Sequence, residues 1–140
     1  MPNLATSEKK LILTFGYGNQ KNYDVFVDYL KEFNVTCAID VRLSPRAWSR
    51  KWYGSAIESL CNSRNIQYIS KTSLGNLSGC ERWIPPEKSE AEQTLSEVAE
   101  IVENGNILTL CAEMDSSRCH RTEVASKLNR LTNVLVKHLK

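Results

Sequence analysis

The chain has 140 residues, of which 41% are hydrophobic and 24% are charged, and its 18 basic and 16 acidic side chains leave a formal net charge of +2. This length and composition are typical of one globular domain with its own core, and they exclude a disordered or fibrous protein. A net charge this small creates no strong overall electrostatic field, so it does not by itself indicate a nucleic acid or a membrane as partner.

The apolar runs and the cysteines indicate the cellular compartment of the protein. The longest runs, such as 11–15 and 107–112, are too short to span a bilayer. Residues 1–10 are polar, and no apolar segment follows a basic start as it does in a secretory signal peptide. The five cysteines include no Cys-x-x-Cys pair. We therefore expect a cytoplasmic protein with reduced thiols and no membrane attachment.

In the first half of the chain, apolar residues predict strands that alternate with helices. Residues 11–15 form a β-rich run that stops at a glycine, and a helix is expected over residues 22–33. A second strand follows at 35–41. The sequence Ser55-Ala-Ile-Glu58 has the capping-box pattern and opens a short predicted helix. A third strand at 66–69 precedes the one long loop, residues 71–86.

The second half continues the alternation. Ser89-Glu-Ala-Glu92 repeats the capping-box pattern, and a helical apolar face runs up to Gly105. The most apolar strand, 107–111, precedes a helix over about 119–131 and a last strand at 133–136. This order predicts an α/β fold, with a mostly parallel sheet of about five strands and helices on both faces. We expect a single Rossmann-like domain over residues 11–140, and a disordered or loosely attached segment over residues 1–10.

The ends of the predicted strands carry the unusual polar residues. In open parallel sheets, ligands bind beyond the carboxyl ends of the strands. Asp40 and Arg42 are two positions apart, so both side chains point to one face, where they form either an internal ion pair or part of an anion site. The glycine turn after the first strand lacks the third glycine of a dinucleotide fingerprint, so we predict no nicotinamide or flavin cofactor. The expected ligand-binding residues are Gly16, Tyr17, Asn19, Asp40, Arg42 and Arg121.

The stretch LTLCAEMDSSRCHR, residues 108–121, allows three chemical interpretations. Adjacent Cys119 and His120 rarely point at one ion, so we predict no metal site. Cys119 lies beside basic residues near a helix start, which would lower its pKa and suits a nucleophile, or a redox sensor together with Cys111. Alternatively, the helix start and Arg121 hold an anion, with Glu113 as general acid or base.

A basic and aromatic segment follows the second strand. Residues 41–57 contain no acidic side chain, and cations interleaved with aromatic rings suit a nucleotide or a single strand of nucleic acid. The alternative is that Trp52 and Tyr53 pack as anchors of the loop itself. The expected nucleic-acid contacts are Arg46, Trp48, Arg50, Lys51 and Trp52.

The motifs together resemble domain-of-unknown-function family 488. They are Thr14–Asn19, Asp40-Val-Arg42 with Pro45, Leu74-Gly75, Leu110-Cys-Ala-Glu113 and Cys119-His-Arg121. The match runs in order from about residue 11 to residue 136. The resemblance implies a small cytoplasmic Rossmann-like domain whose motif residues are Gly16, Asn19, Asp40, Arg42, Glu113, Cys119, His120 and Arg121. The family commonly has a hydroxyl residue two places after the motif proline, whereas this chain has Ala47.

These observations favour an enzyme that acts on a phosphate-bearing or nucleotide-like substrate. Without a cofactor motif, hydrolysis is the expected reaction. Arg42 and Arg121 would hold the anion, Glu113 would act as the acid or base, and His120 or Cys119 would assist. A non-enzymatic nucleic-acid-binding module and a thiol redox sensor are the two alternatives.

Overall fold

The computed structural model describes residues 10–18, 20–45, 47, 49–78, 82–111 and 120–139. Its strands are β1 (Leu11–Gly16), β2 (Val35–Asp40), β3 (Gln67–Ser70), β4 (Asn106–Cys111) and β5 (Leu135–His138). Its helices are α1 (Asp24–Glu32), α2 (Gly54–Asn62), α3 (Lys88–Val102) and α4 (Arg121–Thr132), and two short 3-10 turns are η2 (Arg50–Trp52) and η3 (Thr72–Leu74). None of the described helices is both long enough and apolar enough to cross a membrane.

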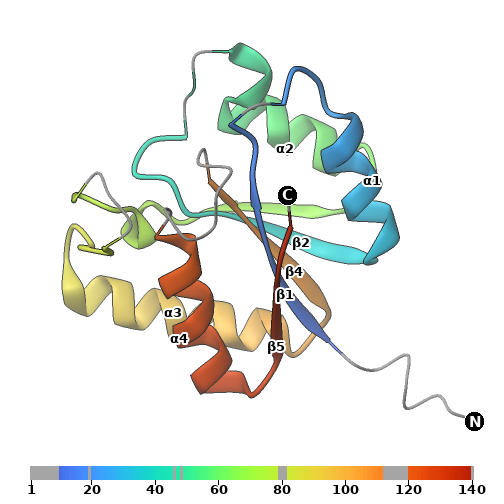
Figure 1. The fold of residues 1–140 in the computed structure, drawn as a ribbon. Coiled ribbons are helices and arrows are strands. Elements are labelled where there is room, and N and C mark those ends of the chain that lie inside the picture. Colours follow the sequence, from blue (N-terminus) through green and yellow to red (C-terminus); the bar gives the residue numbers. More distant parts are fainter. Residues whose placement is uncertain are drawn as a thin grey trace, which may run out of the picture.

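The five strands form one parallel sheet in the order β3-β2-β4-β1-β5. The chain moves from β1 through β2 to β3 in one direction across the sheet and then returns to β4 and β5 in the other. Because crossovers between parallel strands are right-handed, the two directions place their helices on opposite faces. Figure 1 shows α1 and α2 on one side of the sheet and α3 and α4 on the other. The predicted α/β fold with a five-stranded parallel sheet is confirmed.

Both faces of the sheet are buried. On β4, Ile107 belongs to the apolar cluster under α3 and α4, and the next residue, Leu108, belongs to the cluster under α1 and α2. Ile12 and Leu13 of β1 divide in the same way. Neighbouring residues therefore alternate between two dry layers, which is why the central strands are continuous apolar runs.

The two capping-box predictions were wrong about which residue caps the helix. Helix α2 begins at Gly54, so Ser55 lies inside its first turn, and the N-cap Tyr53 makes no side-chain capping bond. The N–H of Gly54 instead donates to the carbonyl of Pro45 at 2.8 Å. Helix α3 is capped by Glu87, whose side chain accepts from the N–H of Ser89 at 3.0 Å. The start of α2 thus depends on a contact with Pro45, whereas α3 is capped locally by Glu87 in place of the predicted serine.

At the carboxyl ends of the strands, the chain leaves β4 toward the opposite face of the sheet from its two neighbours. The chain leaves β1 and β2, the two neighbours of β4, toward the layer of α1 and α2, whereas it leaves β4 toward α4 on the opposite face. In open α/β sheets, ligands bind where adjacent strands send their connections to opposite faces. The carboxyl end of β4 and its two neighbours is therefore the part of the fold where a site is expected.

Candidate functional site

Asp40 and Arg42 form a buried ion pair at the end of β2. The guanidinium of Arg42 donates from Nε to Asp40 Oδ1 at 2.8 Å and from Nη2 to Asp40 Oδ2 at 2.6 Å. Asp40 is fully buried and Arg42 is 6% exposed. Burial disfavours the charge of Arg42, but its bonds to Asp40 more than offset that cost and raise its pKa above the ordinary value. Of the two arrangements that the sequence allowed, the structure contains the internal ion pair.

Tyr17 and Trp52 also contact Arg42. Its Nη1 donates to the Tyr17 hydroxyl at 3.1 Å and to the Trp52 carbonyl at 2.7 Å. The bonds to these two residues and to Asp40 use four of the five N–H groups of a guanidinium. The rings of Tyr17 and Trp52 stack with centroids 4.8 Å apart, and the guanidinium lies 5.4 Å from the centre of the Tyr17 ring. Arg42 is therefore held in one position by β1, β2 and η2 together.

Tyr68 of β3 is a member of this cluster that the sequence analysis missed. Its hydroxyl donates to Asp40 Oδ2 at 2.5 Å. Burial, followed by the bond to Asp40, raises the pKa of Tyr68 well above its ordinary value. Ala38 and Tyr68 are register partners in the sheet, which brings the hydroxyl under the carboxylate two residues further along β2. Only the register of β2 against β3 carries this signal, and the sequence alone does not supply it.

The start of α4 is joined to the end of β2. His120, which precedes α4 and is 6% exposed, makes a bond of 2.9 Å from Nε2 to the carbonyl of Val41. Because a carbonyl oxygen only accepts, Nε2 carries the proton and the lone pair of the neutral ring is on Nδ1. Arg121, the first residue of α4, is fully buried. The pKa of His138 on β5 is lowered, first by desolvation of its ring and second by the positive charge of Arg121.

The remaining predicted site residues divide into two groups. Gly16, the last residue of β1, is buried and is the register partner of Cys111 on β4. Four residues of the predicted catalytic and ligand-binding set thus come to the carboxyl ends of β1 and β2 and two to the start of α4. Asn19, Arg46, Trp48, Glu113 and Cys119 lie outside the described residues.

The predicted nucleic-acid segment contains one firmly packed residue. Trp52 is 2% exposed, and Tyr23 and Phe26 contact its ring edge-on at 5.2 and 5.7 Å. Trp52 is therefore an anchor of its loop, as the alternative interpretation held, and its ring has little surface on which a base could stack. Arg50 is exposed and Lys51 is half-buried.

Two buried thiols lie on β2 and α2. Burial raises the pKa of Cys37 to about 12 and the pKa of Cys61 to about 11. Neither thiol would form the reactive thiolate near neutral pH. Cys111, one of the two cysteines of the redox alternative, is 7% exposed. Within the described part of the chain, no three metal-binding side chains lie close enough together to hold an ion.

A comparison with protein-family models gives one match, described as "Domain of unknown function DUF488", which covers residues 22–128. This span includes β2 and the start of α4, and with them the ion pair and the residues His120 and Arg121. No curated protein and no solved structure matches the chain.

Proposed function

The chain belongs to the DUF488 family, and we propose that it is a cytoplasmic enzyme that hydrolyses a phosphate-bearing or nucleotide-like substrate at the carboxyl edge of its sheet. The observation that carries the proposal is the 2.9 Å bond from His120 to the carbonyl of Val41. This bond ties the start of α4 to the residue between Asp40 and Arg42. Buried titratable groups from two chain segments meet where open α/β sheets bind ligands, and such clusters are enriched at active sites.

The charges favour an anionic substrate. Arg121 places a second guanidinium at the first residue of α4, a helix of 12 residues. The N-terminus of a helix also carries a partial positive charge and unsatisfied N–H groups, which together bind phosphate. Because Arg121 is fully buried, little water screens its charge. In the proposal, the phosphate lies against the first turn of α4, and Arg42 lines the opposite side.

His120 is suited to proton transfer in this reaction. With Nε2–H fixed on the Val41 carbonyl, the imidazole can accept or release a proton only through Nδ1. In the hydrolysis, a water oxygen bonds to phosphorus while the ester P–O bond breaks. One group takes the proton from the water and another protonates the leaving oxygen. We assign these two roles to His120 and Glu113, with Cys119 as an assisting group near the same helix start.

The test combines ligand binding with turnover. A thermal-shift panel contains phosphate, mononucleotides, dinucleotides, and short single- and double-stranded nucleic acids at fixed salt. A ligand at a hundredfold its Kd adds about 2.7 kcal/mol of stability, which raises the Tm of a domain of this size by several degrees. We expect a shift with a phosphate-bearing small molecule. A response to polymers alone would favour a nucleic-acid-binding module over the enzyme.

Turnover of the responding ligand then tests the assigned roles. Glu113→Gln should abolish turnover and leave binding largely intact, because the amide keeps the shape but cannot exchange a proton. Glu103→Gln is the matched control, since Glu103 is an exposed residue at the C-terminal end of α3, and it should change neither quantity. Equal loss of binding and turnover in Glu113→Gln would contradict the assigned role.

A further inference from the structure

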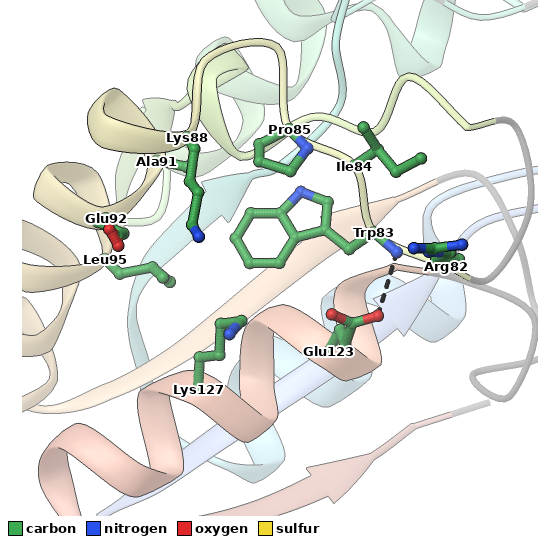
Figure 2. Close-up of a pocket in the computed structure, with 10 residues that line it drawn as sticks. All are labelled: Arg82, Trp83, Ile84, Pro85, Lys88, Ala91, Glu92, Leu95, Glu123 and Lys127. Atoms are coloured by element: carbon green, nitrogen blue, oxygen red, sulfur yellow. Dashed lines mark hydrogen bonds between the residues drawn. The ribbon is translucent and has the colours of Figure 1, made fainter.

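A cavity lies between α3 and α4, in the helix layer opposite the Asp40–Arg42 pair. Its volume is about 370 Å³, within the range of small-molecule sites. The loop that leads into α3 forms one wall, and Figure 2 shows the Trp83 indole in the middle of the residues that line the cavity. The cavity includes Glu123 of the first turn of α4, but its floor and its lysines are not part of the site of the proposed hydrolysis. A ligand could bind here whether or not that hydrolysis occurs.

The floor of this cavity is apolar and fixed. Trp83, Ala91 and Leu95 line it and are each less than a tenth exposed. The indole N–H of Trp83 donates to the carbonyl of Gly75 at 2.9 Å, and its backbone N–H donates to Glu123 Oε1 at 3.1 Å. These two bonds, to the long loop and to α4, hold the ring in place. The floor is therefore formed before any ligand arrives, which lowers the entropy cost of binding.

Cationic side chains surround the floor. Lys88 begins α3 and Lys127 lies on α4, and Figure 2 shows both ammonium groups pointing toward the space beside the indole. Arg82 lies beside the backbone of Trp83, on the side away from the two lysines. Neither lysine forms an ion pair with any residue that the structure describes, whereas Lys71 is paired with Glu97 of α3 at 3.2 Å. The lysines at the cavity therefore keep charges that a ligand can neutralise.

The acids of the cavity do not cancel this charge. Glu123 and Glu92 line it together with the three cations Arg82, Lys88 and Lys127. One oxygen of Glu123 already accepts the backbone N–H of Trp83. An anion between the two ammonium groups would gain charge-assisted hydrogen bonds from both helices, and a dianion would gain more than a monoanion. An apolar body attached to that anion would cover the indole, Ala91 and Leu95.

We propose that this cavity is a binding site for a small phosphate monoester with an apolar body. The phosphate lies between Lys88 and Lys127, and the body lies on the floor beside Trp83. The two ammonium groups match the phosphate of such a ligand, and the apolar floor matches its body. Inorganic phosphate lacks the apolar half, and a neutral alcohol lacks the charged half.

The probe is phenylphosphonate at pH 8, because its C–P bond resists hydrolysis and its binding is therefore read independently of any phosphatase activity. The readout is the indole N–H signal of Trp83 in a proton–nitrogen NMR titration, assigned with Trp83→Phe. We expect a saturable shift of this signal. Phosphate, phenol and benzoate, which lack the body, the charge and the second negative charge respectively, should each bind at least about tenfold more weakly.

Substitutions at the exposed Lys88 and the half-buried Lys127 test the two lysines without changing a fully buried side chain. The double variant Lys88→Gln/Lys127→Gln should raise the Kd for phenylphosphonate at least about tenfold, since two charge-assisted contacts are lost. Lys31→Gln, an exposed lysine at the end of α1, is the control and should leave the Kd unchanged.

Three results would overturn the proposal. They are no shift of the Trp83 signal at about 10 mM probe, equal binding by the double variant, and equal binding of phosphate, phenol or benzoate. Binding that moves signals at the start of α4 but not that of Trp83 would also reject this cavity, while it would support the hydrolytic site. The two proposals can therefore fail separately.

Discussion

Replacement of Asp40 by asparagine removes one charge from an ion pair that is buried on both sides. Asp40 is fully buried and accepts two hydrogen bonds from the Arg42 guanidinium and one from the Tyr68 hydroxyl. Asparagine keeps the size and one acceptor oxygen, but it leaves the guanidinium of Arg42 charged and 6% exposed without its counterion. Removal of one partner from such a pair costs about 3–5 kcal/mol.

This loss is large enough to measure and small enough to leave a folded protein if the parent is of average stability. In a domain of this size, about 3–5 kcal/mol corresponds to a fall in Tm of about 10–17 °C. The free energy of unfolding would be measured by urea titration with circular dichroism, beside Asp28→Asn as control. Asp28 is an exposed residue of α1, and its substitution should change stability by less than about 0.5 kcal/mol.

A milder variant, Tyr68→Phe, tests the same carboxylate alone and in combination with Asp40→Asn. Tyr68→Phe removes only one hydrogen bond to the carboxylate, which costs about 1.5–3 kcal/mol. In an Asp40→Asn background the same change should cost less, because the charged acceptor is gone. A loss below about 1 kcal/mol for Asp40→Asn, or equal costs of Tyr68→Phe in both backgrounds, would refute the view that this pair organises the end of β2.

Three further predictions concern packing and titration. Gly54→Ala should lower the free energy of unfolding by about 1–3 kcal/mol, because the new Cβ would lie 2.6 Å from the Tyr68 hydroxyl. The control Ser55→Ala, at an exposed neighbouring residue, should be nearly neutral in the same urea titration. Equal effects of the two substitutions would contradict the prediction. Stability should fall as the pH rises above 9, because the Cys37 thiol ionises near 9.0 in the unfolded chain while burial raises its folded pKa to about 12; a pH series of urea titrations in which Cys37→Ala leaves that slope unchanged would exclude this cause. In a proton NMR titration, His138 should show a pKa below 6.5, since partial desolvation of its ring and then the charge of Arg121 lower it, and a value at or above 6.5 would contradict this prediction.

The periodicity of the sequence was sufficient for the class and order of the elements, but less so for their ends. The last strand was expected at 133–136 and lies at Leu135–His138. Asn133 adopts a left-handed conformation with φ of 60° after α4, and the side-chain amide of Asn129 donates to the Val134 carbonyl at 2.8 Å. The chain therefore needs two more residues to turn into the sheet. This turn depends on a side-chain contact that apolar spacing does not encode.

The candidate site shows the same division. The spacing of Asp40 and Arg42 was enough to place both on one face of β2, and the choice between an ion pair and an anion site then depended on burial. The register of β3 against β2 brings Tyr68 to the carboxylate of Asp40. Two hydrogen bonds, to residues 8 and 40 positions away, fix Trp83 in its place. Such contacts are made between segments that have no common periodicity. Sequence patterns locate an edge of the sheet, whereas the partners at that edge require the assembled fold.

The position of β4 has a consequence for how the chain folds. β1 and β2 are not neighbours, because β4 lies between them, and Leu108 is the register partner of both Leu13 and Ala38. A nascent chain that ends before residue 106 thus holds two central strands without the strand that joins them. The missing pairs, Leu13 with Leu108 and Ala38 with Leu108, are 95 and 70 residues apart, which makes closure slow. Refolding should accordingly depend on the late entry of β4 into the gap. The same step brings α4 with His120 and Arg121 to the end of β2, so the completion of the sheet and the assembly of the candidate site are one event.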